Sequence, residues 1–279
     1  MQFCKMNGAG NDFIIINNVQ EAIPHERFPS IARTLCHRHL SIGADGLMVV
    51  EQPTGGADFR MLFYNADGSA GEMCGNGARC ICRYGFETGL SGEKQVVETP
   101  SGIVTGWRMG KRNYKIRLTD PSVIDLFHPV KALGQSWECS YVELGTPGLP
   151  HAVVPMENLG EKGFDELREL GRALRHHSVF PKGANVNFYS IDAENELTLR
   201  TFERGVEDFT YACGTGTGST VLALTLMGRV SGREVVVKNP GGTLLVTVER
   251  SGNKIENLWL TGPTNIVCSG EVFDEDLDI

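Results

Sequence analysis

Two short segments of the sequence place a cysteine directly before a run of glycines and small polar residues. "EMCGNGARC" covers residues 72–80 and "YACGTGTGS" covers residues 211–219, so Cys74 and Cys213 lie 139 residues apart. We call residues 74–77 and 213–216 the cysteine corners and expect a helix to begin at each. A helix start exposes unpaired N–H groups and the positive end of the helix dipole, which favours a thiolate over a thiol. Such a position can lower the pKa of a cysteine below its free value of about 8.5.

The glycines that follow the two cysteines leave backbone N–H groups uncovered: Gly75, Gly77, Gly214 and Gly216. Chains build pockets for a carboxylate or a phosphate in this way. One corner of this kind is explained equally well by a helix start with a buried cysteine. Two corners in equivalent positions indicate a shared chemical task.

Two acid–base groups on opposite sides of one carbon can remove a proton from one face and return a proton to the other, which inverts a stereocentre. The α-proton of an amino acid is very weakly acidic, so the carbanion needs stabilisation. Helix N-termini directed at the α-carboxylate supply it electrostatically, in a site that excludes water. We therefore predict that Cys74 and Cys213 are catalytic, one starting as thiolate and the other as thiol.

The two corners belong to a longer internal repeat whose offset stays between 139 and 140 residues. "GADGLMVV" (43–50) aligns with "GANVNFYS" (183–190), and "QVVETPSG" (95–102) aligns with "VVVKNPGG" (235–242). In a fainter match, Asp12 aligns with His151. A period this long is not that of a solenoid, whose units run to roughly 20–50 residues. It predicts two fused copies of one domain.

Each copy reads as a strand, a helix, a second strand, the cysteine corner with its helix, and further strands. The corner helices should end near Gly89 and Gly228, since glycine suits a helix stop. "VLALTLMG" (221–228) is apolar on every face, which predicts a helix enclosed by strands. The expected fold class is α/β (α+β), with two pseudo-symmetric domains, each a curved, mainly antiparallel sheet wrapped around a central helix. The expected boundaries are 1–118, carrying Cys74, and 119–263, carrying Cys213, with a tail at 264–279 that packs back on the first half.

The composition is that of an ordinary globular protein, with 41% hydrophobic and 22% charged residues in 279. The net charge of −8 argues against a nucleic-acid partner, which needs clustered Lys and Arg. The longest apolar run near the start, residues 13–16, is too short for a signal peptide or a membrane span, so we expect a cytoplasmic protein. The eight cysteines include no CxxC spacing, so no metal site is predicted. Without an export signal we expect no disulfide framework, and most of the cysteines should be small buried hydrophobes.

The segment "NADGSAGEMCGNGAR" (65–79) resembles the signature of the diaminopimelate epimerase family, which are amino-acid racemases independent of pyridoxal phosphate. "NGAGNDF" (7–13), "GADG" (43–46), "NVNF" (185–188), "ERG" (203–205) and "ACGTG" (212–216) resemble its other motifs in the same order. The resemblance implies two related α/β domains with a catalytic cysteine at each central helix, no metal or organic cofactor, and a homodimer. It also implies conversion of L,L- to meso-diaminopimelate, which feeds lysine and peptidoglycan synthesis.

The resemblance also implies roles for individual residues beyond the two acid–base cysteines. The reacting α-carboxylate would be held by helix-start amides at Gly75, Asn76, Gly214 and Thr215. The rest of the amino acid would be positioned by Asn11, Asn65, Asn185, Glu203 and Arg204. Arg204 and the asparagines would bind the distal amino-carboxylate end, because a planar guanidinium suits a carboxylate. His151 and Glu203 would tune the thiols.

Each of these roles has a simpler structural alternative. Asn11 and Asn65 lie among Gly and Asp, where Asn often serves turn geometry alone. Arg204 could be a solvated surface charge, and His151 a packed core histidine. His176 and His177 are expected at a helix end, where cations are favourable, and are assigned a structural role.

One departure from the family pattern concerns the substrate. Many members have "GNPH", with the Asn touching the distal end of the substrate, whereas this chain has "GLPH" at residues 148–151. Leu149 cannot form a side-chain hydrogen bond, which leaves Asn65, Asn185 and Arg204 for a second carboxylate. The alternatives are a two-thiol racemase of another amino acid, such as histidine, and a non-enzymatic protein that uses the paired thiols for redox sensing or ligand binding.

Overall fold

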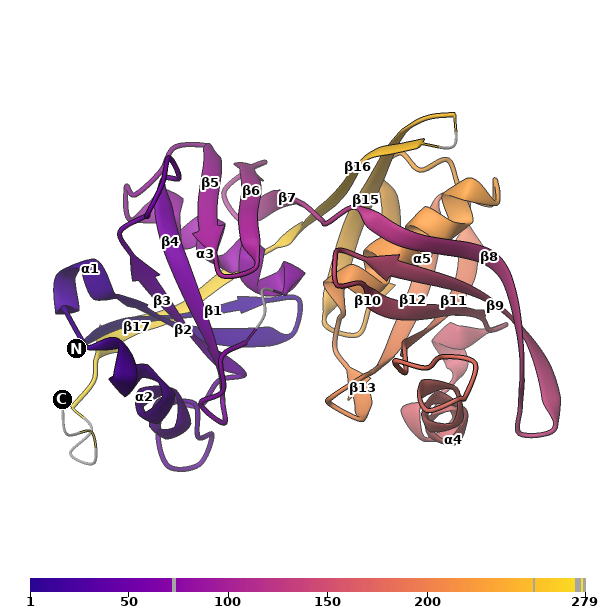
Figure 1. The fold of residues 1–279 in the computed structure, drawn as a ribbon, viewed down its shortest axis with the longest axis horizontal. Coiled ribbons are helices and arrows are strands. Elements are labelled where there is room, and N and C mark those ends of the chain that lie inside the picture. Colours follow the sequence, from indigo (N-terminus) through magenta and orange to yellow (C-terminus); the bar gives the residue numbers. More distant parts are fainter. Residues whose placement is uncertain (72–73, 253, 274–276, 278–279) are drawn as a thin grey trace. The chain divides into compact units, whose positions relative to one another are not determined.

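The computed structural model describes residues 1–71, 74–252, 254–273 and 277 (Figure 1). Residues 72 and 73 of the first cysteine motif, and residues 274–276, 278 and 279 of the predicted tail, lie outside this description. The chain forms two compact units, the first of Met1–Ile116 with Gly262–Ile279 and the second of Arg117–Thr261. Within the described residues, no helix is both long and apolar enough to span a membrane.

The first unit is built on a curved sheet whose neighbouring strands are all antiparallel except for two pairs. The parallel pairs are β2–β3 and β4–β5. The strands follow one another across the sheet in the order β17 (Asn265–Glu271), β1 (Gln2–Gly8), β2 (Asn11–Asn17), β3 (Gly46–Glu51), β4 (Phe59–Asn65), β5 (Lys94–Thr99), β6 (Gly102–Arg108) and β7 (Asn113–Arg117).

The second unit repeats this order and this pattern of directions. Its parallel pairs are β10–β11 and β12–β14. The short strand β13 (Asp208–Thr210) pairs antiparallel with the last three residues of β12. The order is β8 (Pro121–Ala132), β9 (Gln135–Leu144), β10 (Leu149–Pro155), β11 (Asn185–Ala193), β12 (Glu196–Glu203), β14 (Val235–Asn239), β15 (Gly242–Ser251) and β16 (Lys254–Pro263). The mixed α/β class with mainly antiparallel sheets is thereby confirmed.

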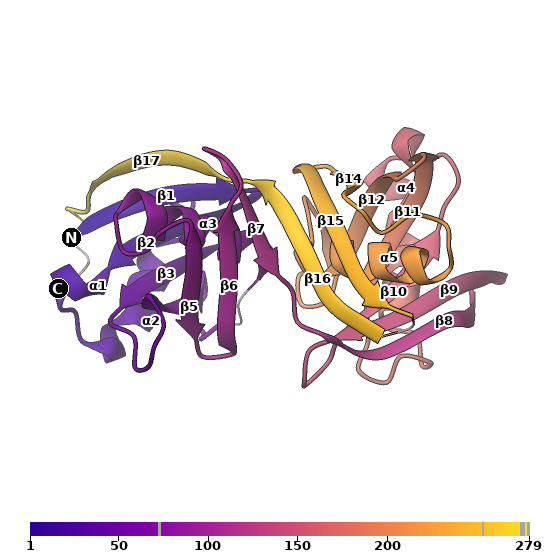
Figure 2. The same cartoon turned by 90° about the horizontal axis from the view of Figure 1, so that it is seen from above.

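A central helix lies inside the curve of each sheet (Figures 1 and 2). Helix α3 (Gly75–Glu87) contacts β1 and β2 near one end of its strand order and β5 and β6 near the other. Helix α5 (Gly214–Leu226) likewise contacts β9, β10 and β11 as well as β15. One helix reaches both ends of a strand order because the sheet bends around it. α5 is buried along its length from Gly216 to Thr225, as its all-round apolar sequence predicts.

The outer face of each sheet is covered by an amphipathic helix, α2 (Phe28–Leu35) in the first unit and α4 (Phe164–Arg175) in the second. Strands of the sheet are buried on both faces and therefore read as continuous apolar runs, such as residues 13–16 and 47–50. His176 caps the end of α4 and pairs with Glu207 at 2.9 Å, in line with its predicted structural role. The remaining helical turns are α1 (Asn18–Glu21), η1 (His25–Arg27) and η2 (Leu159–Glu161).

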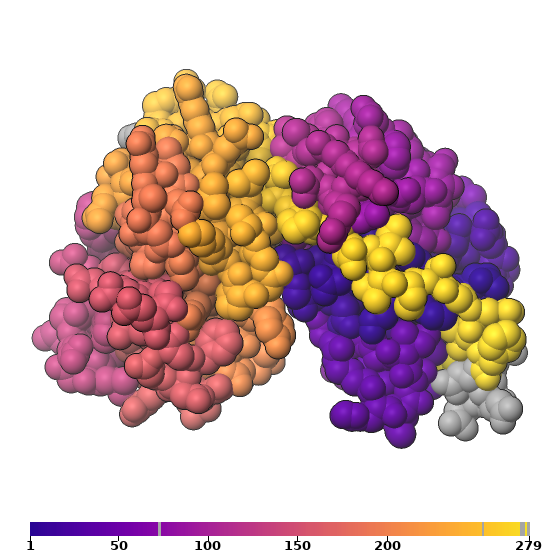
Figure 3. Space-filling model, turned by 180° about the vertical axis from the view of Figure 1, so that it is seen from behind, coloured from indigo at the N-terminus to yellow at the C-terminus, as the bar shows by residue number. Residues whose placement is uncertain are grey.

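The end of the chain completes the first unit. β17 pairs antiparallel with β1, and the Val272 N–H donates to the Met1 carbonyl at 2.8 Å. Figure 3 shows this C-terminal segment (yellow) lying on the indigo surface of the N-terminal strands. The strand that follows β7 along the chain, β8, belongs to the second unit, whereas the strand that follows β16 belongs to the first. The first unit therefore receives its edge strand β17 from the end of the chain, whereas the second unit is contiguous from Arg117 to Thr261.

Candidate active site

Each cysteine corner is a helix N-cap made by sulfur. Cys74 caps α3 and its Sγ accepts a hydrogen bond from the Gly77 N–H at 3.3 Å. Cys213 caps α5 and its Sγ accepts from the Gly216 N–H at 3.4 Å. Both cysteines have the extended backbone typical of an N-cap, a position normally taken by an oxygen-bearing side chain. The predicted helix starts are confirmed, and both sulfurs lie at the positive end of a helix dipole.

The third residue of each corner helix is a glycine that lies directly against the sheet. A Cβ atom at Gly77 would lie 2.5 Å from Met48 Cε, and one at Gly216 would lie 2.2 Å from Asn187 Oδ1. Met48 and Asn187 are each the third residue of their strand, β3 and β11. The sheet residue beneath the first corner is therefore apolar, whereas the sheet residue beneath the second corner is polar.

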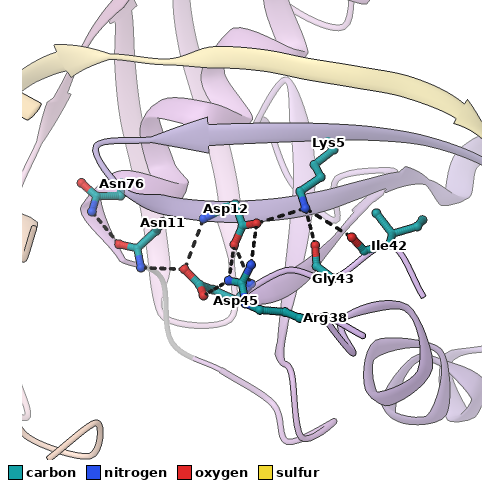
Figure 4. A network of polar contacts seen from close by, with 8 residues as sticks. All are labelled: Lys5, Asn11, Asp12, Arg38, Ile42, Gly43, Asp45 and Asn76. Atoms are coloured by element: carbon teal, nitrogen blue, oxygen red, sulfur yellow. Dashed lines mark hydrogen bonds and ion pairs between the residues drawn. The ribbon is translucent and has the colours of Figure 1, made fainter. Parts of the chain in front are cut away.

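The first corner is tied to a cluster of charged side chains by two asparagines (Figure 4). Asn76 Nδ2 donates to Asn11 Oδ1 at 2.7 Å, and Asn11 Nδ2 donates to Asp45 Oδ2 at 2.9 Å. Arg38 then bridges Asp45 and Asp12, donating to them at 2.6 and 2.7 Å. The structure thus brings the predicted residues Asn11 and Asn76 together and connects both to carboxylates that were not predicted.

The carboxylate of Asp12 is held ionised within this cluster. Lys5 pairs with it at 3.1 Å, and Arg38 reaches both of its oxygens. Burial opposes the ionisation of Asp12, but the hydrogen bonds from Arg38 and Lys5 outweigh burial and lower its pKa below the ordinary value. Lys5 also donates to the carbonyls of Ile42 and Gly43, which joins β1 to the loop before β3.

The second corner rests on a buried network of neutral polar groups. His151 on β10 and Asn187 on β11 are fully buried, and Asn187 Nδ2 lies 3.3 Å from His151 Nδ1. The same Nδ2 donates to the carbonyls of Ala152 and Asn185, each at 3.2 Å, so the amide nitrogen faces the imidazole. His151 Nδ1 must then be an acceptor, and the ring proton resides on Nε2.

Burial lowers the pKa of His151 to about 3, with a smaller contribution from the charge of Arg204. The imidazole is therefore neutral at physiological pH. Its Nε2 is buried and has no hydrogen-bond partner among the described residues. Any tuning of a thiol by His151 must proceed through hydrogen bonding, because the ring carries no charge.

Four of the remaining predicted residues lie at or next to strand ends, and Thr215 lies in the first turn of α5. Asn65 ends β4, and its Nδ2 donates to Ser69 Oγ at 3.0 Å within a tight turn. Asn185 begins β11 and accepts the backbone N–H of Arg204 at 2.8 Å. Glu203 is half-buried at the end of β12, whereas Arg204 is exposed. Thr215 Oγ1 lies 3.5 Å from Cys213 Sγ.

Three residues of these networks were missed by the sequence analysis: Arg79, Asn187 and Asp45. Asn187 lies two residues after Asn185 in "NVNF", and on a strand that spacing places both side chains on one face. Arg79 is a charged residue in the second turn of a helix that is otherwise buried there. These two signals were available in the sequence, whereas Asp45 carried none beyond its place in "GADG".

The buried cysteines outside the corners are inert thiols. Burial raises the pKa of Cys36, Cys80, Cys82 and Cys139 to about 12 in each case. Cys268 is exposed on β17. Within the described residues, no group of three His, Cys, Asp or Glu side chains is arranged to hold a metal ion.

A cavity of about 650 Å³ in the second unit is separate from these networks. Its walls include Phe127, Met156, Tyr189 and Arg229, and none of the predicted site residues lines it. The cysteine corners, and not this cavity, are therefore the candidate active site.

Comparison with known proteins places these features in a family context. A family model described as diaminopimelate epimerase matches residues 3–121 and 145–267. The chain is 37% identical over 288 residues to a diaminopimelate epimerase of Aquifex aeolicus (strain VF5), covering 100% of both chains. It is 38% identical over 272 residues to that of Chlorobaculum tepidum, covering 96% of this chain and 99% of the relative. A crystal structure of a probable proline racemase from Agrobacterium radiobacter K84 has a TM-score of 0.70 at 17% identity, covering 99% of this chain and 94% of that one, a likeness of fold alone.

Proposed function

The chain belongs to the diaminopimelate epimerase family, and from this premise we propose that it interconverts L,L- and meso-diaminopimelate through acid–base chemistry of Cys74 and Cys213. The observation that carries the proposal is the pair of cysteine N-caps on two equivalently placed buried helices. A thiolate at such a position is stabilised by the helix dipole and by a backbone N–H. Each sulfur is thus suited to exchange a proton.

The α-carboxylate of the substrate binds at the helix starts. The first N–H groups of a helix have no acceptor within the helix, and a carboxylate satisfies them. Gly75 and Asn76 in the first unit, and Gly214 and Thr215 in the second, are the residues at these positions. As the α-carbon loses its proton, negative charge spreads onto the carboxylate, so these interactions strengthen in the transition state.

The proton transfers balance without any change in oxidation state. The thiolate of one cysteine takes the α-proton and becomes a thiol, leaving a carbanion at the α-carbon. The thiol of the other cysteine donates its proton to the opposite face and becomes a thiolate. The product is the epimer, and the next turnover in the reverse direction uses the same two groups with their roles exchanged.

The distal end of the substrate binds Arg204, Asn65 and Asn185. The guanidinium of Arg204 is exposed and its Nη1 donates to the Lys182 carbonyl at 3.2 Å, which leaves further N–H groups for a carboxylate. Asn185 supports Arg204 by accepting its backbone N–H. These groups serve in place of the amide that Leu149 lacks.

Glu203 and His151 act on the reacting groups from the second unit. His151 contributes as a neutral hydrogen-bonding group, with its Nε2 proton available to a thiolate or to substrate. Glu203 supplies negative charge for the substrate ammonium groups. We further propose that the enzyme is a homodimer, as the family resemblance implies, and that it is cytoplasmic.

The proposal is tested by incubating the protein with L,L-diaminopimelate in deuterium oxide. We expect meso-diaminopimelate carrying deuterium at the inverted α-carbon, observed by chiral chromatography and mass spectrometry. Parallel incubations with L-histidine and other L-amino acids test the rival substrates. Exchange with one of those and none with diaminopimelate would overturn the substrate assignment while preserving the chemistry.

The catalytic roles are tested with Cys74→Ser and Cys213→Ser, using Cys268→Ser as the matched control because Cys268 is exposed on β17. Loss of an acid–base group costs typically about 10²–10⁴-fold in rate, so we expect kcat to fall by at least about 100-fold in each corner variant. The control should retain wild-type kcat. A thiol-based sensor without enzymatic activity predicts no turnover in the wild type, which separates the two classes of function.

A further inference from the structure

A fully buried arginine lies directly behind the first cysteine corner. The exposed fraction of Arg79 is 0%, and its guanidinium donates to the Gly75 carbonyl at 3.2 Å and to Asn76 Oδ1 at 2.8 Å. Both acceptors belong to the two residues that follow Cys74. The thiols of Cys80 and Cys74 lie close enough to interact with the charge of Arg79. Among the ion pairs that the described residues form with carboxylates, none involves Arg79.

The position of Arg79 is set by a chain of hydrogen bonds whose direction is unambiguous. The carboxylate of Asp45 accepts from Arg38 and from Asn11 Nδ2, so the Oδ1 of Asn11 faces Asn76 (Figure 4). Asn76 presents its Nδ2 to Asn11, and its Oδ1 is therefore directed at Arg79. The hydrogen bonds that link Asp45, Asn11 and Asn76 fix Asn76 Oδ1 as an acceptor for the guanidinium of Arg79. They thereby keep this cation at the start of α3.

The charged cluster at the Asp45 end of this chain of hydrogen bonds does not neutralise Arg79. It contains the cations Lys5 and Arg38 and the carboxylates Asp12 and Asp45, which pair with one another. The charges of this cluster therefore balance internally. The positive charge of Arg79 adds to that of the α3 dipole, and a nearby anion in this buried setting is strongly stabilised.

The second corner has no equivalent cation on its helix. The residue one repeat after Arg79 is Gly218, which packs against Leu118 and Leu258. The groups beneath the corner are the neutral side chains of His151, Asn187 and Thr201. Beyond them, Glu203 and Arg204 carry opposite charges.

We infer that Arg79 is a positioning residue that stabilises a thiolate at Cys74, so that in the free protein Cys74 is the thiolate and Cys213 is the thiol. Cys80 remains a thiol because burial raises its pKa to about 12. Cys74 is then the group beside Arg79 that carries the balancing negative charge. The inference deepens the proposed function and rests on it only for the consequence that Cys74 is the base in the first turnover of free enzyme.

The test measures the rate of alkylation of each cysteine by iodoacetamide as a function of pH, with the modified peptides quantified by mass spectrometry. The midpoint of each profile reports ionisation of that thiol, whereas the plateau reports access, so the deeper burial of Cys213 does not affect the comparison. We expect the Cys74 midpoint to lie at least about one pH unit below that of Cys213, a tenfold difference in the thiolate-to-thiol ratio. Equal midpoints, or a lower midpoint for Cys213, would overturn the inference.

Two substitutions separate the charge of Arg79 from its packing. Arg79→Met keeps much of the volume and removes the charge, so the Cys74 midpoint should rise by about one pH unit while that of Cys213 stays unchanged. Arg79→Lys keeps the charge and should keep the Cys74 midpoint low. If Arg79→Met does not fold, the wild-type and Arg79→Lys profiles still decide, because a Lys variant with a raised Cys74 midpoint contradicts a charge effect.

The result is independent of the proposed function because the profiles are recorded without substrate. A protein that shows the expected midpoints but no α-deuterium exchange keeps the effect of Arg79 and loses the epimerase assignment. A protein that epimerises diaminopimelate while Cys213 ionises first keeps the assignment and loses this inference.

Discussion

At the scale of single residues, the two repeats place a charged side chain and a neutral side chain at matching positions. Asp12 in the first repeat is ionised and paired with Lys5 and Arg38, whereas His151, which aligns with it, is neutral and enclosed. Burial disfavours the protonated form of this imidazole in the folded state. The free energy of unfolding therefore falls at a pH low enough to protonate the same imidazole in the unfolded chain. The burial that keeps His151 neutral therefore makes the fold sensitive to acid.

We expect the stability of the wild type relative to a His151→Gln variant to decrease as the pH falls below about 6.5. The pKa of His151 is about 3 in the folded state and about 6.5 when unfolded, so between these values the unfolded chain binds a proton that the folded chain does not. The contribution of neutral His151 is thus complete above the unfolded pKa and is lost progressively towards pH 3. Urea unfolding of both proteins from about pH 8 to about pH 4 measures the difference, and a pH-independent difference would contradict the assignment.

At the scale of elements, the corner helices are held against their sheets so closely that a single methyl group matters. The neighbour of Gly77 is the end of Met48, a flexible side chain that can move aside. The neighbour of Gly216 is Asn187 Oδ1, which is held by Thr201 at 3.0 Å and by the bonds of its own amide nitrogen. The same contact therefore has different consequences in the two units.

We expect Gly216→Ala to destabilise the protein by about 1–3 kcal/mol, the range for overpacking a well-packed interior, and Gly77→Ala to cost less. The two substitutions add the same methyl group at equivalent helix positions, so each serves as the control for the other. Urea unfolding midpoints measure the comparison. Equal losses of stability would contradict this prediction, because they would show that Asn187 moves aside as readily as Met48 does.

At the scale of the whole molecule, the chain passes between the units twice, once between Ile116 and Arg117 and once between Thr261 and Gly262. The second passage returns the C-terminal strand to the edge of the first unit, where β17 covers β1. An uncovered strand edge leaves a row of unpaired backbone groups. The first unit is therefore completed only when the last part of the chain is present.

A chain truncated after Pro263 should lose protection selectively in the first unit. Removing β17 frees the backbone groups of β1 that pair with it from Gln2 to Asn7, so amide hydrogen exchange should accelerate in β1 and β2. β11 in the second unit serves as the internal reference. Equal acceleration in β11, or none in β1, would contradict this account of the edge strand. The repeat boundaries at residues 118 and 263 themselves remain a prediction.

Much of the fold was readable from local patterns in the sequence. The glycine runs after Cys74 and Cys213 predicted two helix starts, and the apolar runs predicted the strands between the helices. Helices α3 and α5 have the same length of 13 residues and begin 139 residues apart, as the repeat offset requires. These features are set by neighbours in the chain, because helix starts depend on a few consecutive residues and strands on short apolar periods.

The sequence by itself determined the repeat, the cysteine corners and the family. It did not determine the full element order, because the first unit has two strands before α2 and two between α2 and α3 where one each was expected. Tertiary structure alone decided which polar groups meet beneath each corner. Asn11 reaches Asn76 across 65 residues, and His151 reaches Asn187 across 36. Such pairs depend on the register between strands and on how closely a helix approaches the sheet. Neither is encoded by the spacing of apolar residues along a strand or a helix. The place of Arg79 in the second turn of α3 was readable from the sequence, whereas its complete burial is decided by the strands that pack around this helix.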